Sequence, residues 1–88
     1  MELKLTHDLI RAHLFNGSFR PMSKTDYDEY NGADEGSLIA DITLGRYTYG
    51  VIFLPATGAV QINTFDETIN ELYAWEMDLN NGNYVRLS

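Results

Sequence analysis

The chain of 88 residues has no cysteine, so it contains no disulfide bond and no thiolate that binds a metal or attacks a substrate. Its longest apolar run, from Val51 to Leu54, is far too short to cross a bilayer. The N-terminal residues 1–8 lack the apolar core of a signal peptide, so we expect a soluble cytoplasmic protein. At this length we expect one domain over residues 1–88.

Motifs that indicate catalysis are also missing. The sequence has no Gly-x-Ser-x-Gly, no phosphate-binding glycine loop and no His-x-Glu motif. The carboxylates of residues 26–35 do not have EF-hand spacing, because no glycine stands at the sixth position from the first or second aspartate. We therefore expect no enzymatic activity, no cofactor and no bound metal, and a small enzyme or metal-binding domain is the hypothesis that the motifs favour least.

Basic residues are scarce and unevenly placed. The chain has 6 Lys and Arg against 13 Asp and Glu, a formal net charge of −7. Residues 1–24 carry a net +2, whereas residues 25–85 contain eleven acids and one base, Arg46, and so carry −10. Such a surface repels nucleic acid and anionic lipid and attracts a basic surface. Acidic surfaces also keep proteins soluble, and charge alone does not separate these two roles.

The clearest local pattern is a β-hairpin in the middle of the chain. Residues 38–44 and 47–54 are rich in β-branched and aromatic side chains, and Gly45-Arg46 suits a two-residue turn with glycine first. This turn places Leu44 opposite Tyr47, and the same register gathers the apolar residues of both strands on one face.

A third strand is predicted to follow the hairpin. The Pro-Ala-Thr-Gly sequence of residues 55–58 favours a turn, and residues 59–63 then return beside the second strand. Pairing Phe53 with Val60 extends the same apolar face. We therefore predict a three-stranded antiparallel meander.

Two helices are predicted to flank the meander. The first begins after the cap residue Thr6 and ends near Phe15. The second is predicted over residues 65–79, because Thr64-Phe65-Asp66-Glu67 has the form of a capping box. Its apolar stripe should pack on one sheet face, although Glu76 would then fall on the apolar side; the stripe consists of Phe65, Ile69, Leu72, Tyr73 and Leu79. With an edge strand at 84–87, the predicted fold class is α+β.

We expect the contact residues of this protein in two acidic segments. The first is irregular, and its tyrosines and carboxylates suit contact with Arg and Lys through cation–π and charge-assisted bonds. The second follows the outer side of the predicted second helix. The candidate partner-binding residues are Asp26, Tyr27, Asp28, Glu29, Tyr30, Asp34 and Glu35 in the first segment, and Glu67, Glu71 and Asp78 in the second.

In size, acidity and lack of catalytic motifs, the chain resembles small phage-encoded inhibitors: anti-CRISPR, anti-restriction and uracil-glycosylase-inhibitor proteins. The resemblance involves the character of the whole chain and no shared motif, so it assigns no role to any residue. It implies a DNA mimic that blocks a basic, nucleic-acid-binding surface of a larger protein in a bacterial host cell. Neither nucleic acid nor a membrane is expected as a direct partner. The alternative is a general interaction module: an adaptor, an immunity-type partner or a homodimer.

Overall fold

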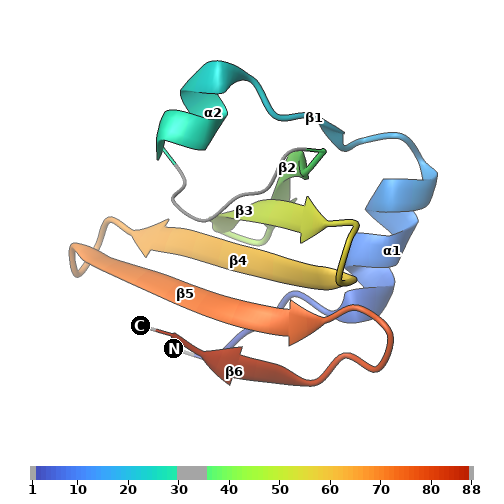
Figure 1. The fold of residues 1–88 in the computed structure, drawn as a ribbon. Helices are drawn as coiled ribbons and strands as arrows, with labels where there is room; N and C mark the ends of the chain where they lie inside the picture. Colours follow the sequence, from blue (N-terminus) through green and yellow to red (C-terminus); the bar gives the residue numbers. More distant parts are fainter. Residues whose placement is uncertain (1, 30–35, 88) are drawn as a thin grey trace.

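The computed structural model describes residues 2–29 and 36–87, and for residues 27–29 it describes the backbone alone. Six strands form one antiparallel sheet in the order β1 to β6, so strands adjacent in the sheet are also consecutive in the sequence (Figure 1). The elements are α1 (His7–Phe15), β1 (Arg20–Pro21), α2 (Lys24–Glu29), β2 (Leu38–Leu44), β3 (Tyr47–Leu54), β4 (Ala59–Asp66), β5 (Glu71–Asp78) and β6 (Tyr84–Arg86).

The middle of the sheet has the predicted pairing. β2 and β3 pair with Leu44 opposite Tyr47, and β3 and β4 pair with Phe53 opposite Val60. Gly45 has a φ of 64°, a left-handed conformation that the hairpin turn requires and that glycine adopts without steric cost. The predicted register is therefore confirmed across these three strands.

The first helix also follows its local signals. The Thr6 side chain accepts a hydrogen bond from the backbone N–H of Leu9 at 3.3 Å, which caps the first turn of α1. Asn16 ends the helix, and Gly17 follows with a φ of 76°. The residues that begin and end this helix lie next to it in the sequence, which explains why it could be predicted from the sequence.

The predicted α+β fold is wrong, because the helix expected over residues 65–79 does not form. β4 continues to Asp66, a turn follows, and β5 runs back beside β4 over its whole length. The Thr64 hydroxyl donates to the backbone carbonyl of Thr48 at 2.8 Å and so does not cap a helix. Asn70 has a φ of 54°, which is incompatible with a right-handed helix through this point.

The alternation of side chains along β5 explains the correction. Tyr73, Trp75 and Met77 are buried, whereas Leu72 and Glu76 are exposed. This period of two belongs to a strand with one covered face. Glu76 is thus an exposed strand residue, and its carboxylate does not face the apolar side as it would on the predicted helix. The predicted C-terminal edge strand is present as β6, and Leu87 N–H extends its pairing by donating to the Ala74 carbonyl at 2.8 Å.

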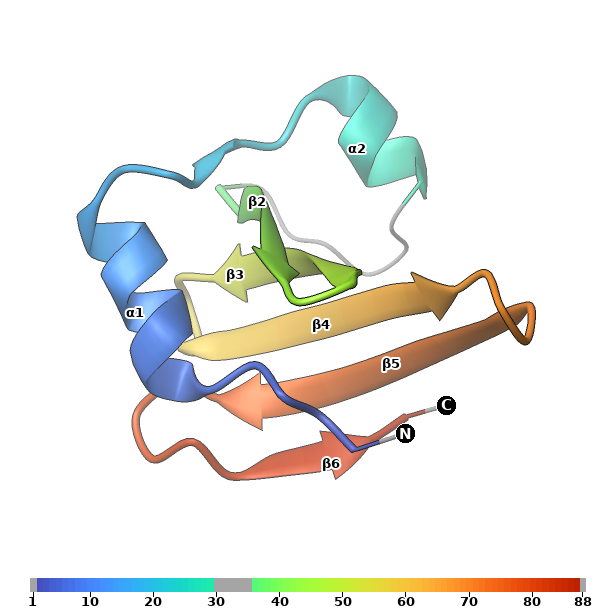
Figure 2. The same ribbon diagram turned by 180° about the vertical axis from the view of Figure 1, so that it is seen from behind.

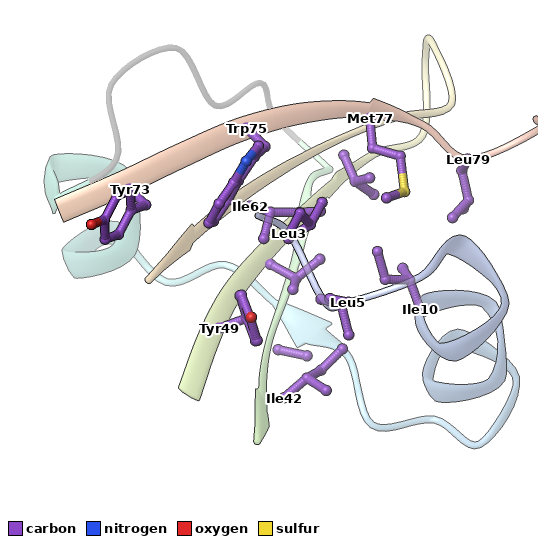
Figure 3. Packing of buried hydrophobic residues seen from close by; sticks show 13 residues of the cluster. Leu3, Leu5, Ile10, Ile42, Tyr49, Ile62, Tyr73, Trp75, Met77 and Leu79 are labelled. Carbon is purple, nitrogen blue, oxygen red and sulfur yellow. The ribbon is translucent and has the colours of Figure 1, made fainter. Parts of the chain in front are cut away.

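The hydrophobic core lies on one face of the sheet, here called the core face. The N-terminal segment and α1 lie across this face (Figure 2). Leu3 and Leu5 from the segment and Ile10 from α1 pack into the cluster that contains Tyr49 and Trp75 (Figure 3). The rings of Tyr49 and Trp75 are tilted, with their centroids 6.2 Å apart. A short extended segment and one helix therefore close the core of a six-stranded sheet.

The opposite side of β2–β6 is called the outer face. Its cover is partial: Met22, between β1 and α2, packs with Ile39 and Ile52, and Leu54 adjoins them. The residues of the outer face are Ile39, Asp41 and Thr43 of β2, Thr48, Gly50, Ile52 and Leu54 of β3, Ala59, Gln61, Asn63 and Phe65 of β4, Leu72, Ala74, Glu76 and Asp78 of β5, and Val85 of β6.

Candidate protein-contact surface

The structure describes the side chains of four of the ten predicted contact residues. Tyr30, Asp34 and Glu35 lie outside the described residues, and Tyr27, Asp28 and Glu29 belong to α2 without described side chains. The remaining four are Asp26, at the start of α2, and Glu67, Glu71 and Asp78, in the β4–β5 region. The described side chains thus fall into one internal carboxylate and three exposed ones.

Asp26 is occupied by bonds within the protein. Its carboxylate accepts hydrogen bonds from Arg20 Nη1 at 2.7 Å, from Ser23 N–H at 2.7 Å and from the Ser23 hydroxyl at 2.9 Å. The Ser23 hydroxyl in turn accepts from Asp26 N–H at 3.3 Å, so the two residues form a reciprocal cap at the start of α2. The bonds from Arg20 and Ser23 hold the pKa of Asp26 well below its usual range. Asp26 is therefore a structural residue of α2.

The predicted acidic stripe of Glu67, Glu71 and Asp78 is wrong, because it depended on the second helix. Glu67 lies in the turn between β4 and β5, Glu71 begins β5 and Asp78 ends it. Asp78 lies seven positions after Glu71 along the strand, or about 24 Å at 3.4 Å per residue. The odd spacing also points the two side chains to opposite faces. The three carboxylates thus mark the two ends of the β4–β5 hairpin.

Arg46, the single base of residues 25–85, is bound at the Glu67 end. Arg46 Nη2 donates to the Tyr47 hydroxyl at 2.7 Å, and this hydroxyl donates to Asp66 Oδ2 at 3.0 Å. Arg46 Nη2 is itself 3.6 Å from Asp66 Oδ2. Burial raises the pKa of Asp66, but hydrogen bonds from Tyr47 and Thr68 and the charge of Arg46 outweigh burial and lower it. Arg46 is therefore matched by Asp66 and does not offset the charges of Glu67 and Glu71.

Large apolar side chains are exposed along the β4–β5–β6 half of the outer face. Phe65 is 49% exposed and lies directly opposite Leu72, which is 58% exposed. Val85, 62% exposed, lies opposite Glu76, and Leu87, 57% exposed, follows β6. Ile69, 54% exposed, lies in the turn beyond Phe65. These five residues are called the outer strip.

The outer strip is absent from the predicted contact residues because the predicted helix places Phe65, Ile69 and Leu72 in its buried stripe. The usable signal was the alternation in residues 72–78, which places aromatic and sulfur-containing side chains at every second position. Read with that period, Leu72 falls on the face opposite Trp75.

The charged residues that β2–β6 place on the described outer face are all acidic, and Arg46 lies at one end of the outer strip, where it lines a hollow together with Phe65. Asp41, Glu76 and Asp78 are the charged residues of the described outer face of β2–β6, and no Lys or Arg accompanies them there. A hollow of about 390 Å³ lies at the end of β5, where Glu76 and Asp78 line it together with Ala59 and Val85. Figure 1 shows that, of the described elements, no helix crosses this side of β5 and β6. The result is an uncovered sheet face with apolar and acidic residues.

Within residues 2–29 and 36–87, no three His, Asp or Glu side chains are grouped to hold a metal ion. The described helices include none long and apolar enough to span a membrane. Scans against protein-family models, curated proteins and solved structures give no match for this chain.

Proposed function

We propose that this protein is a non-catalytic acidic binding protein that blocks a basic, nucleic-acid-binding surface of a larger protein, as a phage anti-defence inhibitor of the anti-CRISPR type would. The observation that carries the proposal is the surplus of exposed carboxylates on the sheet and its turns. Asp41, Glu67, Glu71, Glu76 and Asp78 are exposed, whereas the bases of residues 36–87 are Arg46, which is matched by Asp66, and Arg86. Such a field attracts a basic surface and accelerates association at low salt.

The dimensions of the protein suit this role. Its longest extent is 33 Å, a length along which duplex DNA carries about 19 phosphate charges at one per 1.7 Å. The sheet presents far fewer carboxylates, so it reproduces only part of the charge of a duplex. Part of the affinity must then come from contacts other than charge, and the outer strip supplies apolar surface for them.

A retention experiment tests the proposal. The tagged protein is immobilised, incubated with bacterial lysate and eluted with a salt gradient, and excess duplex DNA is added in a parallel run. We expect retention of a nucleic-acid-binding protein that salt elutes and that duplex DNA displaces. Retention that neither salt nor DNA weakens, or retention of no nucleic-acid-binding protein, contradicts the proposal.

A charge-reversal pair sharpens this experiment. Glu67→Lys reverses a carboxylate at the tip of the β4–β5 hairpin, and Asp8→Lys reverses an exposed carboxylate on α1, in the basic part of the chain. We expect Glu67→Lys to lower the salt concentration at which the partner elutes more than Asp8→Lys does. Equal shifts would show that net charge alone governs retention. If sedimentation equilibrium shows that the protein forms a homodimer and that this dimer does not bind the partner, the general interaction module is favoured instead.

A further inference from the structure

We propose that the outer strip, with the carboxylates at its two ends, docks a basic amphipathic helix of the partner protein. This inference rests on the proposed function and names the contact surface and the chemistry of what it binds. It joins three observations: uncovered apolar side chains, a face of helical dimensions and carboxylates at both of its ends.

The apolar side chains lie at neighbouring positions of three adjacent strands. Phe65 and Leu72 are register partners, and the Leu87 N–H bonds to the carbonyl of Ala74, two residues after Leu72. Val85 extends the outer strip to the far side of Glu76. Contiguous exposed apolar surface on a small protein marks an interaction site more often than isolated apolar residues do.

The dimensions of the face fit one helix. From Leu72 to Asp78, β5 extends about 20 Å, and the spacing across β4, β5 and β6 is about 10 Å. An α-helix is about 10–12 Å wide, and about 13 residues span 20 Å. Met22 and Leu54 already occupy the outer face over β2 and β3. A helix that lies along the outer strip therefore covers the uncovered half of this face and little else.

The carboxylates near the outer strip determine which charge the docked helix should carry. Glu67 lies beyond one end of the strip, and Glu76 and Asp78 lie at the other. Arg86 points to the opposite face, where its guanidinium lies 5.0 Å from the centroid of the Tyr73 ring. Arg46 also lies at the Glu67 end but is paired with Asp66, so Lys or Arg on the flanks of the helix would meet a surplus of carboxylates. A second copy of this chain, with a net charge of −7, would instead bring like charges together.

A designed peptide tests the docking surface directly. The probe is a 14-residue peptide with leucines at helical spacing and lysines elsewhere, compared with a scrambled peptide of the same composition and with a Leu/Glu analogue. Binding to the full chain is measured by calorimetry, and backbone amide shifts map the contact. We expect binding about tenfold tighter than that of the scrambled peptide, shifts centred on β5 and β6, and a salt dependence that Glu76→Gln reduces.

Matched substitutions complete the test. Leu72→Thr removes an apolar side chain from the strip while keeping a residue that favours strands, and Phe15→Gln removes a side chain that is 93% exposed on α1. We expect about tenfold weaker peptide binding for Leu72→Thr and no change for Phe15→Gln. Equal effects of both variants, shifts mapped to another surface, or tighter binding of the Leu/Glu analogue would overturn the inference.

The retention experiment separates this inference from the proposed function. If Leu72→Thr still retains the nucleic-acid-binding partner at wild-type salt resistance, the docking surface is wrong and the proposed function stands. If the basic peptide binds the outer strip but no nucleic-acid-binding protein is retained, the docking surface stands and the proposed function fails.

Discussion

The two faces of β5 have different cover although they share one backbone. On the core face, Trp75 belongs to the core cluster that Leu3 and Leu5 of the N-terminal segment help to form, and it is 1% exposed. On the outer face, Leu72 and Glu76 are exposed and belong to the uncovered half of the sheet. Strand alternation places side chains that stabilise the core and side chains that are exposed to solvent on the same strand, because neighbouring residues point to opposite sides. Substitutions at adjacent positions of β5 can therefore test stability and contact independently.

The largest difference in stability should appear between two separate substitutions in β5, one on each face. Trp75→Ala should lower the free energy of unfolding by about 3–5 kcal/mol, because it leaves a large cavity in the core. Leu72→Ala should change it by about 0.5 kcal/mol or less. Urea unfolding followed by circular dichroism measures both variants. Comparable losses would contradict the assignment of these two residues to opposite faces.

A second comparison tests the cover of the core face. Leu5→Ala should lower the free energy of unfolding by about 2–5 kcal/mol, because this side chain lies within the core cluster. Lys4→Ala, at the adjacent exposed position, should change it by about 0.5 kcal/mol or less. The fluorescence of Trp75, the single tryptophan, reports the unfolding transition. A small loss for Leu5→Ala would show that the N-terminal segment does not seal the core.

A third comparison concerns the covered half of the outer face, where Asp26 fixes the start of α2. The pKa of Asp26 is lowered from its ordinary value of 3.8, so its ionised form stabilises the fold above that pH. This contribution is lost as the pH falls through the lowered pKa. Asp26→Asn should therefore be less stable than the wild type at about pH 6, and the difference should shrink towards about pH 2. Melting temperatures across this range measure it, and a difference independent of pH would contradict the role of the charge.

The smallest effect should come from Glu76, on the uncovered half of the outer face. Glu76→Gln should change the free energy of unfolding by about 0.5 kcal/mol or less, because the side chain is exposed. A buried position on a helix would instead respond strongly to loss of the charge. Chemical denaturation at neutral pH decides between these results. A marked stabilisation by Gln would indicate that Glu76 is buried.

The sequence predicted elements whose signals are local. The glycine of the Gly45-Arg46 turn and the alternation on both sides of it determined the register of β2 and β3, and Thr6 and Asn16 bracketed α1. The predicted second helix failed because Thr64-Phe65-Asp66-Glu67 matches a helix start while the residues after it also fit a strand. The alternation of Tyr73, Trp75 and Met77 favours the strand against the capping box, and pairing with β4 decides between the two structures.

The candidate contact residues show the same division. The sequence located the acidic segments, but the structure turned Asp26 inward and moved Glu67 and Asp78 to opposite ends of a hairpin. It also exposed Phe65 and Leu72, which had been assigned to the core. Whether a carboxylate is paired or a leucine is covered depends on residues distant in the sequence, and local periodicity contains no such information.

The sequence by itself determined the net charge, the absence of thiol chemistry, the first helix and the three-stranded centre of the sheet. These properties follow from composition or from interactions between residues close along the chain. Only the tertiary structure decided that residues 71–78 form a strand and that the apolar residues around it are divided between a buried face and an uncovered one. The reason is that β5 obtains its hydrogen bonds from β4 and its cover from residues 3–10, and neither is visible in the local sequence.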